Sequence, residues 1–275
     1  AVAGVDVRGA APGTRETDLL RGYNAVEKVH AVMLSGGSAF GLDAASGAMR
    51  YLEENDTGID VGVAKVPIVP AAVIFDLAVG DASVRPGKRE GYLACKAATA
   101  DAQLTGRVGA GTGASVGMSL GIRGAMPGGI GTCCADIGGV RVAALAVVNA
   151  FGDVYDHHTG EILAGARMDD AIVPCMGAPE RMIGQAPGRM PPFVGCVNTT
   201  LGVVATNAAL TREEANKLAS IAHDGYAMAI RPVHTSMDGD TVFALATGET
   251  AYTSFLPLLA AAAEVMALAI QDAVR

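Results

Sequence analysis

Tryptophan is absent from the sequence, and aromatic residues make up only 4% of its 275 residues. Its 20 lysine and arginine residues form no run, and the formal net charge is −8. Phosphate binding needs clustered positive charge, so we expect no nucleic-acid partner. The longest apolar run, Phe255–Ile270, is interrupted by Pro257 and Glu264 and falls short of the roughly 18 residues of a membrane-spanning helix. We therefore expect no membrane partner either.

The sequence also lacks a CxxC pair and a recognisable signal peptide. Its five cysteines, which cannot all pair with one another, are Cys95, Cys133, Cys134, Cys175 and Cys196. Free thiols are typical of a reducing compartment, so we expect a cytoplasmic protein. The sequence opens with AVAGVDVRG and no initiator methionine, from which we expect further residues upstream.

Small apolar residues are abundant: 51% of the chain is hydrophobic and 36 residues are glycine. This composition indicates closely packed layers with few large side chains. Alternating apolar residues predict strands, and helical spacing predicts helices. The expected strands are Val2–Arg8, 31–34, Val73–Leu77, Val140–Val148, Thr199–Ala205 and 240–247, and the expected helices follow the glycine-rich turn after residue 34, cover Glu90–Leu104, begin at Thr211 and cover Phe255–Val274. Because these alternate only loosely, we expect an α+β fold with sheet stacked on sheet and helices outside.

One tract, Ala166–Val194, differs from the rest in composition. It contains five prolines and four methionines, and its apolar residues follow neither a helical nor a strand period. This composition predicts a loop or linker and marks the best candidate boundary in the chain. The helix that follows has a clear start signal. Thr211 and Glu214 stand at the N-cap and N3 positions of a capping box.

The glycine-rich stretches do not fit known nucleotide-binding patterns. Gly109 begins a GxGxG stretch instead of the GxGxxG of dinucleotide-binding folds, and GGSAFG has no P-loop lysine. Ser38 in GGSAFG is not a nucleophile elbow, because Phe40 stands where glycine is required. Ser38 or Ser35 is expected to cap the following helix. The helix N-terminus is an alternative site for a substrate carboxylate or an oxyanion.

Histidines and acidic pairs give weaker signals. The five histidines form no HExxH motif and no metal-ligand spacing with carboxylates, so we expect no metal, and we interpret His223 and His234 as structural. Asp238 and Asp240 flank Gly239. On a strand both carboxylates would point to one face, where a cation or a shared proton must separate them; the alternative is a solvated Asp-Gly turn.

The pair Asn198-Thr199 joins the proline-rich tract directly to a β-branched strand. A threonine hydroxyl needs a base to become a nucleophile, and its own α-amino group is one such base. Self-cleavage at Asn198-Thr199, by attack of the Thr199 hydroxyl on the preceding carbonyl, would create that amine. The alternative is an ordinary threonine at the entry of a strand.

Eight blocks of sequence resemble the self-processing DmpA-type hydrolases, which include L-aminopeptidase/D-amidase-esterases, β-aminopeptidases and nylon-oligomer hydrolases. They are GVDVRGAAPGTRETDLL, LSGGSAFGLDAASG, VPIVPAAVIFDL, GRVGAGTGAS, VVNAFGDV, GEILAGAR, NTTLGVVATNA and HTSMDGDTVFALAT. The resemblance implies one catalytic domain over residues 1–275, an αββα four-layer sandwich of the N-terminal nucleophile type. It also implies cleavage into an α chain of residues 1–198 and a β chain of residues 199–275.

By the same resemblance Thr199 is the N-terminal nucleophile, Asn149 stabilises the oxyanion, and Asp238 and Asp240 are the acidic pair beside the nucleophile. The implied reaction is hydrolysis of small peptides, amino acid amides or ω-amino acid oligomers, with no cofactor. The family's habit and the apolar C-terminal helix imply a homo-oligomer, expected to be a tetramer. The expected substrate pocket includes Ser38, together with two positions at which this chain departs from its relatives.

Those two departures are Phe75, where several relatives carry tyrosine, and Met118, where many carry lysine. Phenylalanine offers no hydroxyl to an oxyanion. Methionine cannot supply the positive charge that would lower the pKa of a neighbouring amine or balance the acidic pair. Two alternatives follow: an acyltransferase resembling the ornithine acetyltransferases, which passes the acyl group to an amine, and a catalytically impaired relative that binds small amino compounds.

Overall fold

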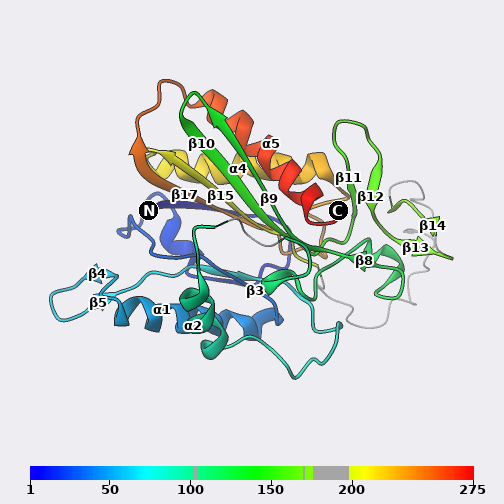
Figure 1. Ribbon diagram of the computed structural model, residues 1–275, viewed down its shortest axis with the longest axis horizontal. Coiled ribbons are helices and arrows are strands. Elements are labelled where there is room, and N and C mark those ends of the chain that lie inside the picture. The colour runs from blue at the N-terminus through cyan, green and yellow to red at the C-terminus, as the bar shows by residue number, and fades with distance from the viewer. Residues whose placement is uncertain (102–104, 170, 176–197) are drawn as a thin grey trace.

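The computed structural model describes residues 1–101, 105–169, 171–175 and 198–275 (Figure 1). In Figure 1 two helices lie above a large twisted sheet, and two further helices lie below a second, smaller sheet. The order of layers is therefore helix, sheet, sheet, helix. This confirms the α+β class and the αββα sandwich expected from the sequence.

The large sheet has five strands in the order β1-β17-β15-β10-β9. Their bounds are β1 Val2–Val7, β17 Thr241–Thr250, β15 Leu201–Ala208, β10 Val140–Val148 and β9 Gly129–Ile137. The central pair, β15 and β17, is parallel, and the other neighbours are antiparallel. Because side chains alternate along a strand, β15 and β17 present apolar residues to both sides of the sheet: Val204 and Val242 pack on one side, and Leu201 and Phe243 on the other. Both faces of the sheet are thereby available for packing.

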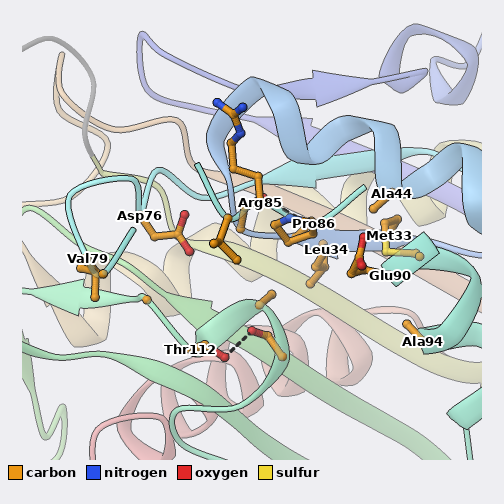
Figure 2. Close-up of a pocket in the computed structure, with 18 of the residues that line it drawn as sticks. Met33, Leu34, Ala44, Asp76, Val79, Arg85, Pro86, Glu90, Ala94 and Thr112 are labelled. Atoms are coloured by element: carbon orange, nitrogen blue, oxygen red, sulfur yellow. Dashed lines mark hydrogen bonds between the residues drawn. The ribbon is translucent and has the colours of Figure 1, made fainter. Parts of the chain in front are cut away.

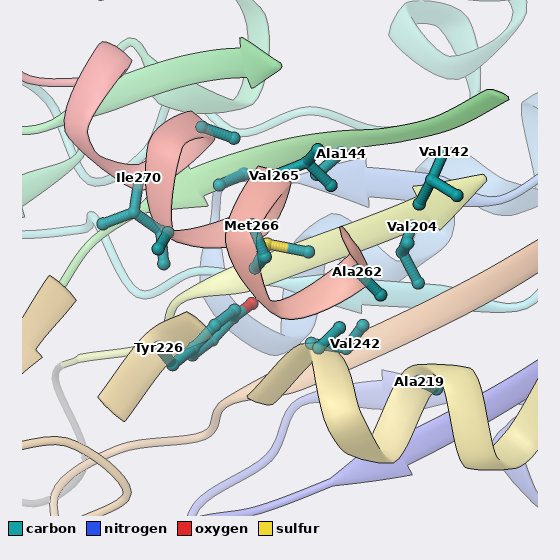
Figure 3. Close-up of a cluster of buried hydrophobic side chains, with 14 of the residues drawn as sticks. Val142, Ala144, Val204, Ala219, Tyr226, Val242, Ala262, Val265, Met266 and Ile270 are labelled. Atoms are coloured by element: carbon teal, nitrogen blue, oxygen red, sulfur yellow. The ribbon is translucent and has the colours of Figure 1, made fainter. Parts of the chain in front are cut away.

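One face is covered by α4 (Arg212–Ala229) and α5 (Leu256–Asp272). Thr211 caps α4 as expected, since its hydroxyl accepts the Glu214 N–H and the Glu214 carboxylate accepts the Thr211 N–H. Figure 3 shows Tyr226 of α4 and Met266 of α5 meeting the valines of the sheet in a buried cluster. Seven apolar side chains of α5 are buried in this cluster, whereas Leu256 at the start of the helix is exposed. Packing within the chain therefore accounts for the apolar residues on the inner side of α5.

The other face of the large sheet stacks on a second sheet with the order β2-β6-β3. These strands are β2 Thr14–Arg15, β6 Ala71–Val73 and β3 Met33–Ser35. The residues that fill the space between the sheets come from both of them, as Ala72, Leu201 and Phe243 illustrate. A third cluster, with Ala45 and Val69, joins the small sheet to α1 (Ala44–Glu54) and α2 (Lys88–Ala97). Three separate hydrophobic clusters thus hold the four layers together.

The remaining elements are short. They are β4 Ile59–Asp60, β5 Lys65–Val66, β7 Ser115–Val116, β8 Met126–Pro127, β11 Asp153–Tyr155, β12 Ile162–Ala164, β13 Arg167–Met168, β14 Ala171–Ile172 and β16 Ile230–Arg231, with 3-10 turns at Thr17–Leu20, Ser38–Asp43, Gly109–Gly111 and Met118–Leu120. Within the described ranges, no helix combines the length and the apolar character needed to cross a bilayer.

Several expected boundaries were wrong. The strand expected at Val73–Leu77 ends at Val73, so Phe75 lies in the loop beyond it. The helix after the glycine-rich turn begins only at Ala44, because a 3-10 turn comes first. Neither serine caps it: the Ser35 hydroxyl donates to the Gly36 carbonyl, and the Ser38 N–H donates to the Ile74 carbonyl.

The proline-rich tract is described only in part. Its first residues form the β13–β14 hairpin, which the sequence did not indicate. Residues 176–194 of the expected linker lie outside the described residues, as does Cys196. The helix expected at Glu90–Leu104 runs from Lys88 to Ala97 instead, so its expected end was wrong.

Candidate active site

Thr199 lies two residues before β15, opposite the residue that follows the end of β10. The strand expected at Thr199–Ala205 thus begins and ends later than expected, at Leu201 and Ala208. It is 4% exposed. Its N–H donates to the Asn149 carbonyl at 2.7 Å, which extends the antiparallel pairing of β10 and β15 by one step. Its hydroxyl Oγ1 lies 2.6 Å from the carbonyl oxygen of Asn198, to which it donates. The backbone pairing thus fixes the residue while its hydroxyl faces the preceding peptide group.

The Asn198 carbonyl accepts a second hydrogen bond, from the Gly239 N–H at 3.0 Å. Two donors on one carbonyl oxygen polarise it in the way that an oxyanion hole does. Gly239 has no room for a side chain: an added Cβ would lie 2.7 Å from Thr199 Oγ1 and would collide with the Ala11 carbonyl. Only glycine brings this N–H so close to the 198–199 peptide bond.

Asp240 is 1% exposed and is held by three hydrogen bonds. Its Oδ1 accepts the Thr200 N–H at 2.8 Å, directly beyond the candidate nucleophile. Its Oδ2 accepts the His234 N–H at 3.2 Å and lies 2.7 Å from His234 Nδ1. The carboxylate thus connects His234 to the backbone that carries Thr199.

His234 belongs to a buried ring cluster. Its ring lies 4.8 Å from that of His223 and 5.8 Å from that of Tyr226, centroid to centroid. Burial is the main reason that the pKa of His223 falls to about 4, so His223 is neutral near pH 7. The Tyr226 hydroxyl is 3.3 Å from the Thr200 carbonyl. His223 is structural as expected, whereas His234 reaches the acidic pair, a role that the sequence interpretation missed.

Asp238 is 2% exposed, so the solvated-turn alternative for this pair was wrong. Its Oδ2 accepts the Thr235 N–H at 2.8 Å and the Thr235 hydroxyl at 2.6 Å. Burial, and next the negative charge of Asp240, raise the pKa of Asp238 to about 6. Both aspartates precede β17 instead of lying on it, and each has its own partner in place of a shared one.

Asn149 hydrogen-bonds residues of two other segments, Phe75 after β6 and Ser115 at the start of β7. It is 2% exposed. Its side-chain oxygen accepts the Ser115 N–H at 3.0 Å, and its side-chain nitrogen donates to the Phe75 carbonyl at 3.1 Å. Asn149 therefore links three residues: its side chain contacts Phe75 and Ser115, and its backbone carbonyl accepts from Thr199.

Met118 is connected to the acidic pair through the backbone of Phe151. Its N–H donates to the Phe151 carbonyl at 2.9 Å, and the Phe151 backbone in turn hydrogen-bonds Asp238. Methionine brings no charge to this position, and the pKa of Asp238 is raised mainly by burial and next by the charge of Asp240.

A cavity of about 650 Å³ opens beside this site, between β3, α1, α2 and the loops after β6 and before β7. Figure 2 shows Asp76 and Arg85 at one part of its wall and Glu90 and Ala94 of α2 at another. Thr199 and the three residues expected in the pocket, Ser38, Phe75 and Met118, do not line it.

Asp76 lines the cavity and directly follows Phe75, whose carbonyl accepts from the Asn149 side chain. Its Oδ1 accepts the Gly37 N–H at 2.7 Å. The glycine-rich turn expected to bind a substrate carboxylate therefore already binds a carboxylate of the chain itself. The charged lining of the cavity is mixed: Asp76, Asp81 and Glu90 are acidic, and Arg85 and Arg107 are basic.

Two stacked sheets between helix layers, with a polarised peptide carbonyl, a threonine and a buried acidic pair at one end of the central strands, are the arrangement of amide-bond hydrolases with the N-terminal nucleophile fold. The family follows from comparison with known proteins. The chain belongs to peptidase family S58, whose model matches residues 1–275.

Its relatives include both peptidases and oligomer hydrolases. An uncharacterized aminopeptidase of Mycobacterium leprae is 48% identical over 256 residues, which cover 92% of this chain and 69% of the relative. A 6-aminohexanoate-oligomer endohydrolase of Kocuria sp. is 32% identical over 247 residues, covering 89% of this chain and 66% of that enzyme.

Solved structures show the same fold. A protein of Pyrococcus horikoshii matches with a TM-score of 0.69 and 22% identity, over 99% of this chain and 72% of that one. The L-aminopeptidase D-Ala-esterase/amidase of Ochrobactrum anthropi, described as a variant of the Ntn hydrolase fold, matches with a TM-score of 0.67 and 17% identity over the same shares. The protein is a hydrolase of peptide or amide bonds.

Proposed function

We propose that the chain cuts its own 198–199 peptide bond and then hydrolyses small amides with Thr199 as N-terminal nucleophile. The observation that supports this most strongly is the 2.6 Å contact of the Thr199 hydroxyl with the Asn198 carbonyl, which Gly239 also polarises. An ordinary strand-entry threonine needs no second donor on the preceding carbonyl.

Self-cleavage would proceed as an N-to-O acyl shift. Thr199 Oγ1 attacks the Asn198 carbonyl carbon, and the Gly239 N–H stabilises the resulting oxyanion. The carbon–nitrogen bond breaks, the hydroxyl proton passes to the Thr199 nitrogen, and an ester joins Asn198 to Oγ1. Water then hydrolyses the ester, which leaves a carboxylate on Asn198 and a free amine on Thr199.

In the mature enzyme the new α-amine would act as base for its own hydroxyl. Its pKa near 7.7–8.0 suits proton transfer at neutral pH. The Asn149 carbonyl already bonds this nitrogen, and Asp240 holds the next residue through the Thr200 N–H. We propose that the Asn149 side chain stabilises the substrate oxyanion and that water releases the acyl group from Thr199.

The substrates proposed are short peptides, amino acid amides and ω-amino acid oligomers, in line with the names of the relatives. These molecules carry an ammonium group. Asp76 is suited to bind it, because its carboxylate lines the cavity and follows Phe75, whose carbonyl bonds Asn149.

Replacement of Asp76 by asparagine is expected to lower kcat/KM for amine-bearing amides by about 10- to 100-fold, because a hydrogen bond to a charged group contributes roughly 1.5–3 kcal/mol. Asparagine keeps the oxygen that accepts the Gly37 N–H, so the loop stays in place. The measurement compares each amide with its uncharged, N-acylated form. An equal loss on both would contradict binding of the ammonium by Asp76.

The raised pKa of Asp238 predicts a pH dependence of stability in the uncut Thr199→Ala chain. Because burial favours the protonated form in the folded state, the stabilisation is present at low pH and is lost as pH rises from about 4 through about 6. The shift corresponds to a loss on the order of 3 kcal/mol. Urea unfolding of this chain with and without Asp238→Asn checks it; a difference that stays constant from pH 3 to 7 would contradict it.

We further propose a cytoplasmic homo-oligomer, which the family resemblance suggests to be a tetramer. Cys95, Cys133 and Cys134 carry free thiols, as a reducing compartment allows. Light scattering of the purified protein measures the number of subunits, and a monomeric mass would contradict the oligomer.

A further inference from the structure

A second cluster of chemically active side chains lies away from Thr199, where the turn between β11 and β12 meets α5. The turn contributes His157 and His158, and the helix contributes Glu264. Glu264 lies 107 positions after His157 and 106 after His158, so the spacing rules that excluded a metal from the sequence did not apply to this group.

The three side chains come together at short distances. Glu264 Oε1 lies 3.2 Å from His157 Nε2 and 3.1 Å from His158 Nε2. All three donor atoms lie within 4.8 Å of one another. Two donor atoms about 2.05 Å from a tetrahedral zinc ion are ~3.3 Å apart. Two of the three separations already have the value that a shared ion requires.

The surroundings hold these ligands in place. The Asp156 carboxylate accepts the N–H groups of His158 and Thr159 at 3.0 Å each, which fixes the turn. Arg275 Nη2 in turn lies 3.1 Å from Asp156. The side chain of His157 is only 5% exposed, whereas that of His158 is 65% exposed, so the cluster has a rigid inner ligand and is open to solvent.

The buried Gln271 amide holds the ring of His157 from its other side. Its nitrogen Nε2 contacts His157 Nδ1, and its oxygen accepts from Arg275 Nη2 at 3.4 Å. In this orientation the amide donates to Nδ1, and His157 Nε2 carries the proton that faces Glu264. Binding of a metal ion at Nε2 would require this proton to move to Nδ1 and the amide to turn so that its oxygen accepts it.

We propose that His157 Nε2, His158 Nε2 and Glu264 form a binding site for a divalent ion of the zinc class, with water completing the coordination. Imidazole and carboxylate ligands suit this class. The site would join the turn of the α chain to α5 of the β chain, since residue 198 lies between them in sequence. It would therefore hold the two chains together after cleavage at 198–199.

Calorimetric titration of the purified protein with zinc sulfate at pH 7.5 tests the site. One ion per chain is expected to bind, and His158→Ala and Glu264→Gln are expected to weaken binding at least about 10-fold. Gln271→Glu is expected to strengthen binding, because its carboxylate offers Nδ1 an acceptor without the amide having to turn. Glu161→Gln, which removes an exposed carboxylate from the same hairpin, serves as the matched control and binds as the wild type does.

Thermal unfolding gives a second readout that does not depend on activity. Zinc is expected to raise the unfolding temperature of the wild type and of Glu161→Gln, and to raise that of Glu264→Gln by less at the same concentration. The proposal is overturned if the wild type binds no zinc, or if His158→Ala and Glu264→Gln bind it as tightly as the wild type does. The latter result would place the ion elsewhere, for example on the exposed Cys134 thiol.

Discussion

Replacement of Thr199 by alanine is expected to leave the chain uncut and to reduce amide hydrolysis by ~10⁴-fold or more, the scale of losses seen when a catalytic nucleophile is removed. The hydroxyl is the group that faces the Asn198 carbonyl at 2.6 Å, and alanine offers no atom in its place. Denaturing mass spectrometry measures the cut, and release of amine from an amino acid amide measures the hydrolysis.

Two further variants make this result specific. Thr199→Ser keeps a hydroxyl and is expected to be cut and active. Thr200→Val removes the neighbouring buried hydroxyl but keeps the N–H that donates to Asp240, so it is expected to be cut as well. A Thr199→Ala chain that is still divided between residues 198 and 199 would show that another group is the nucleophile.

A similarly large effect is expected from Gly239→Ala. The new Cβ would lie 2.7 Å from Thr199 Oγ1 and against the Ala11 carbonyl, so the backbone must shift and the Gly239 N–H must leave the Asn198 carbonyl. Loss of one such donor typically costs ~10²–10³ in rate. The time course of fragment appearance after synthesis is the measurement, and slow or absent cutting is the expected outcome.

Gly22→Ala is the matched control for this variant, because its nearest neighbour would be a Glu213 side-chain atom at 3.5 Å, an ordinary contact. It is expected to be processed at the wild-type rate. If Gly239→Ala were processed equally fast, the polarised carbonyl would have no part in the cut.

The parts of the fold that the sequence predicted well have local causes. Val140–Val148 forms β10 with the expected bounds, because a nearly continuous run of apolar residues suits a strand buried on both faces. Thr211 and Glu214 formed the expected capping box, whose hydrogen bonds connect residues only three apart. The layer order followed from the family resemblance, and the three hydrophobic clusters give its physical reason.

Long-range contacts could not be predicted in this way. β9 was not expected, since its glycines and cysteines show no clear alternation, and its pairing with β10 creates the strand. Gly239 was noted only as part of a turn, and its hydrogen bond to Asn198 depends on a pairing across 40 positions. Met118 and Phe75 were expected to line the pocket. Instead, the Met118 N–H donates to the Phe151 carbonyl, and the Phe75 carbonyl accepts from the Asn149 side chain.

The partners of the acidic pair could not be predicted from the sequence either. Asp238 and Asp240 were both named from the sequence, but the fold decides which groups each carboxylate contacts. Asp238 is held by Thr235, whereas Asp240 is held by His234 and by the backbone beside Thr199. Burial, which no local pattern reports, is the main cause of the raised pKa of Asp238.

The most direct test of the proposed mechanism is the mass and N-terminal sequence of the denatured wild-type protein, measured on the same sample as its amidase activity. We predict two chains, one of them beginning with Thr199, in an amount that rises in proportion to the activity. An undivided chain that hydrolyses amides at the full rate would contradict the mechanism, because its Thr199 would have no free amine to serve as base.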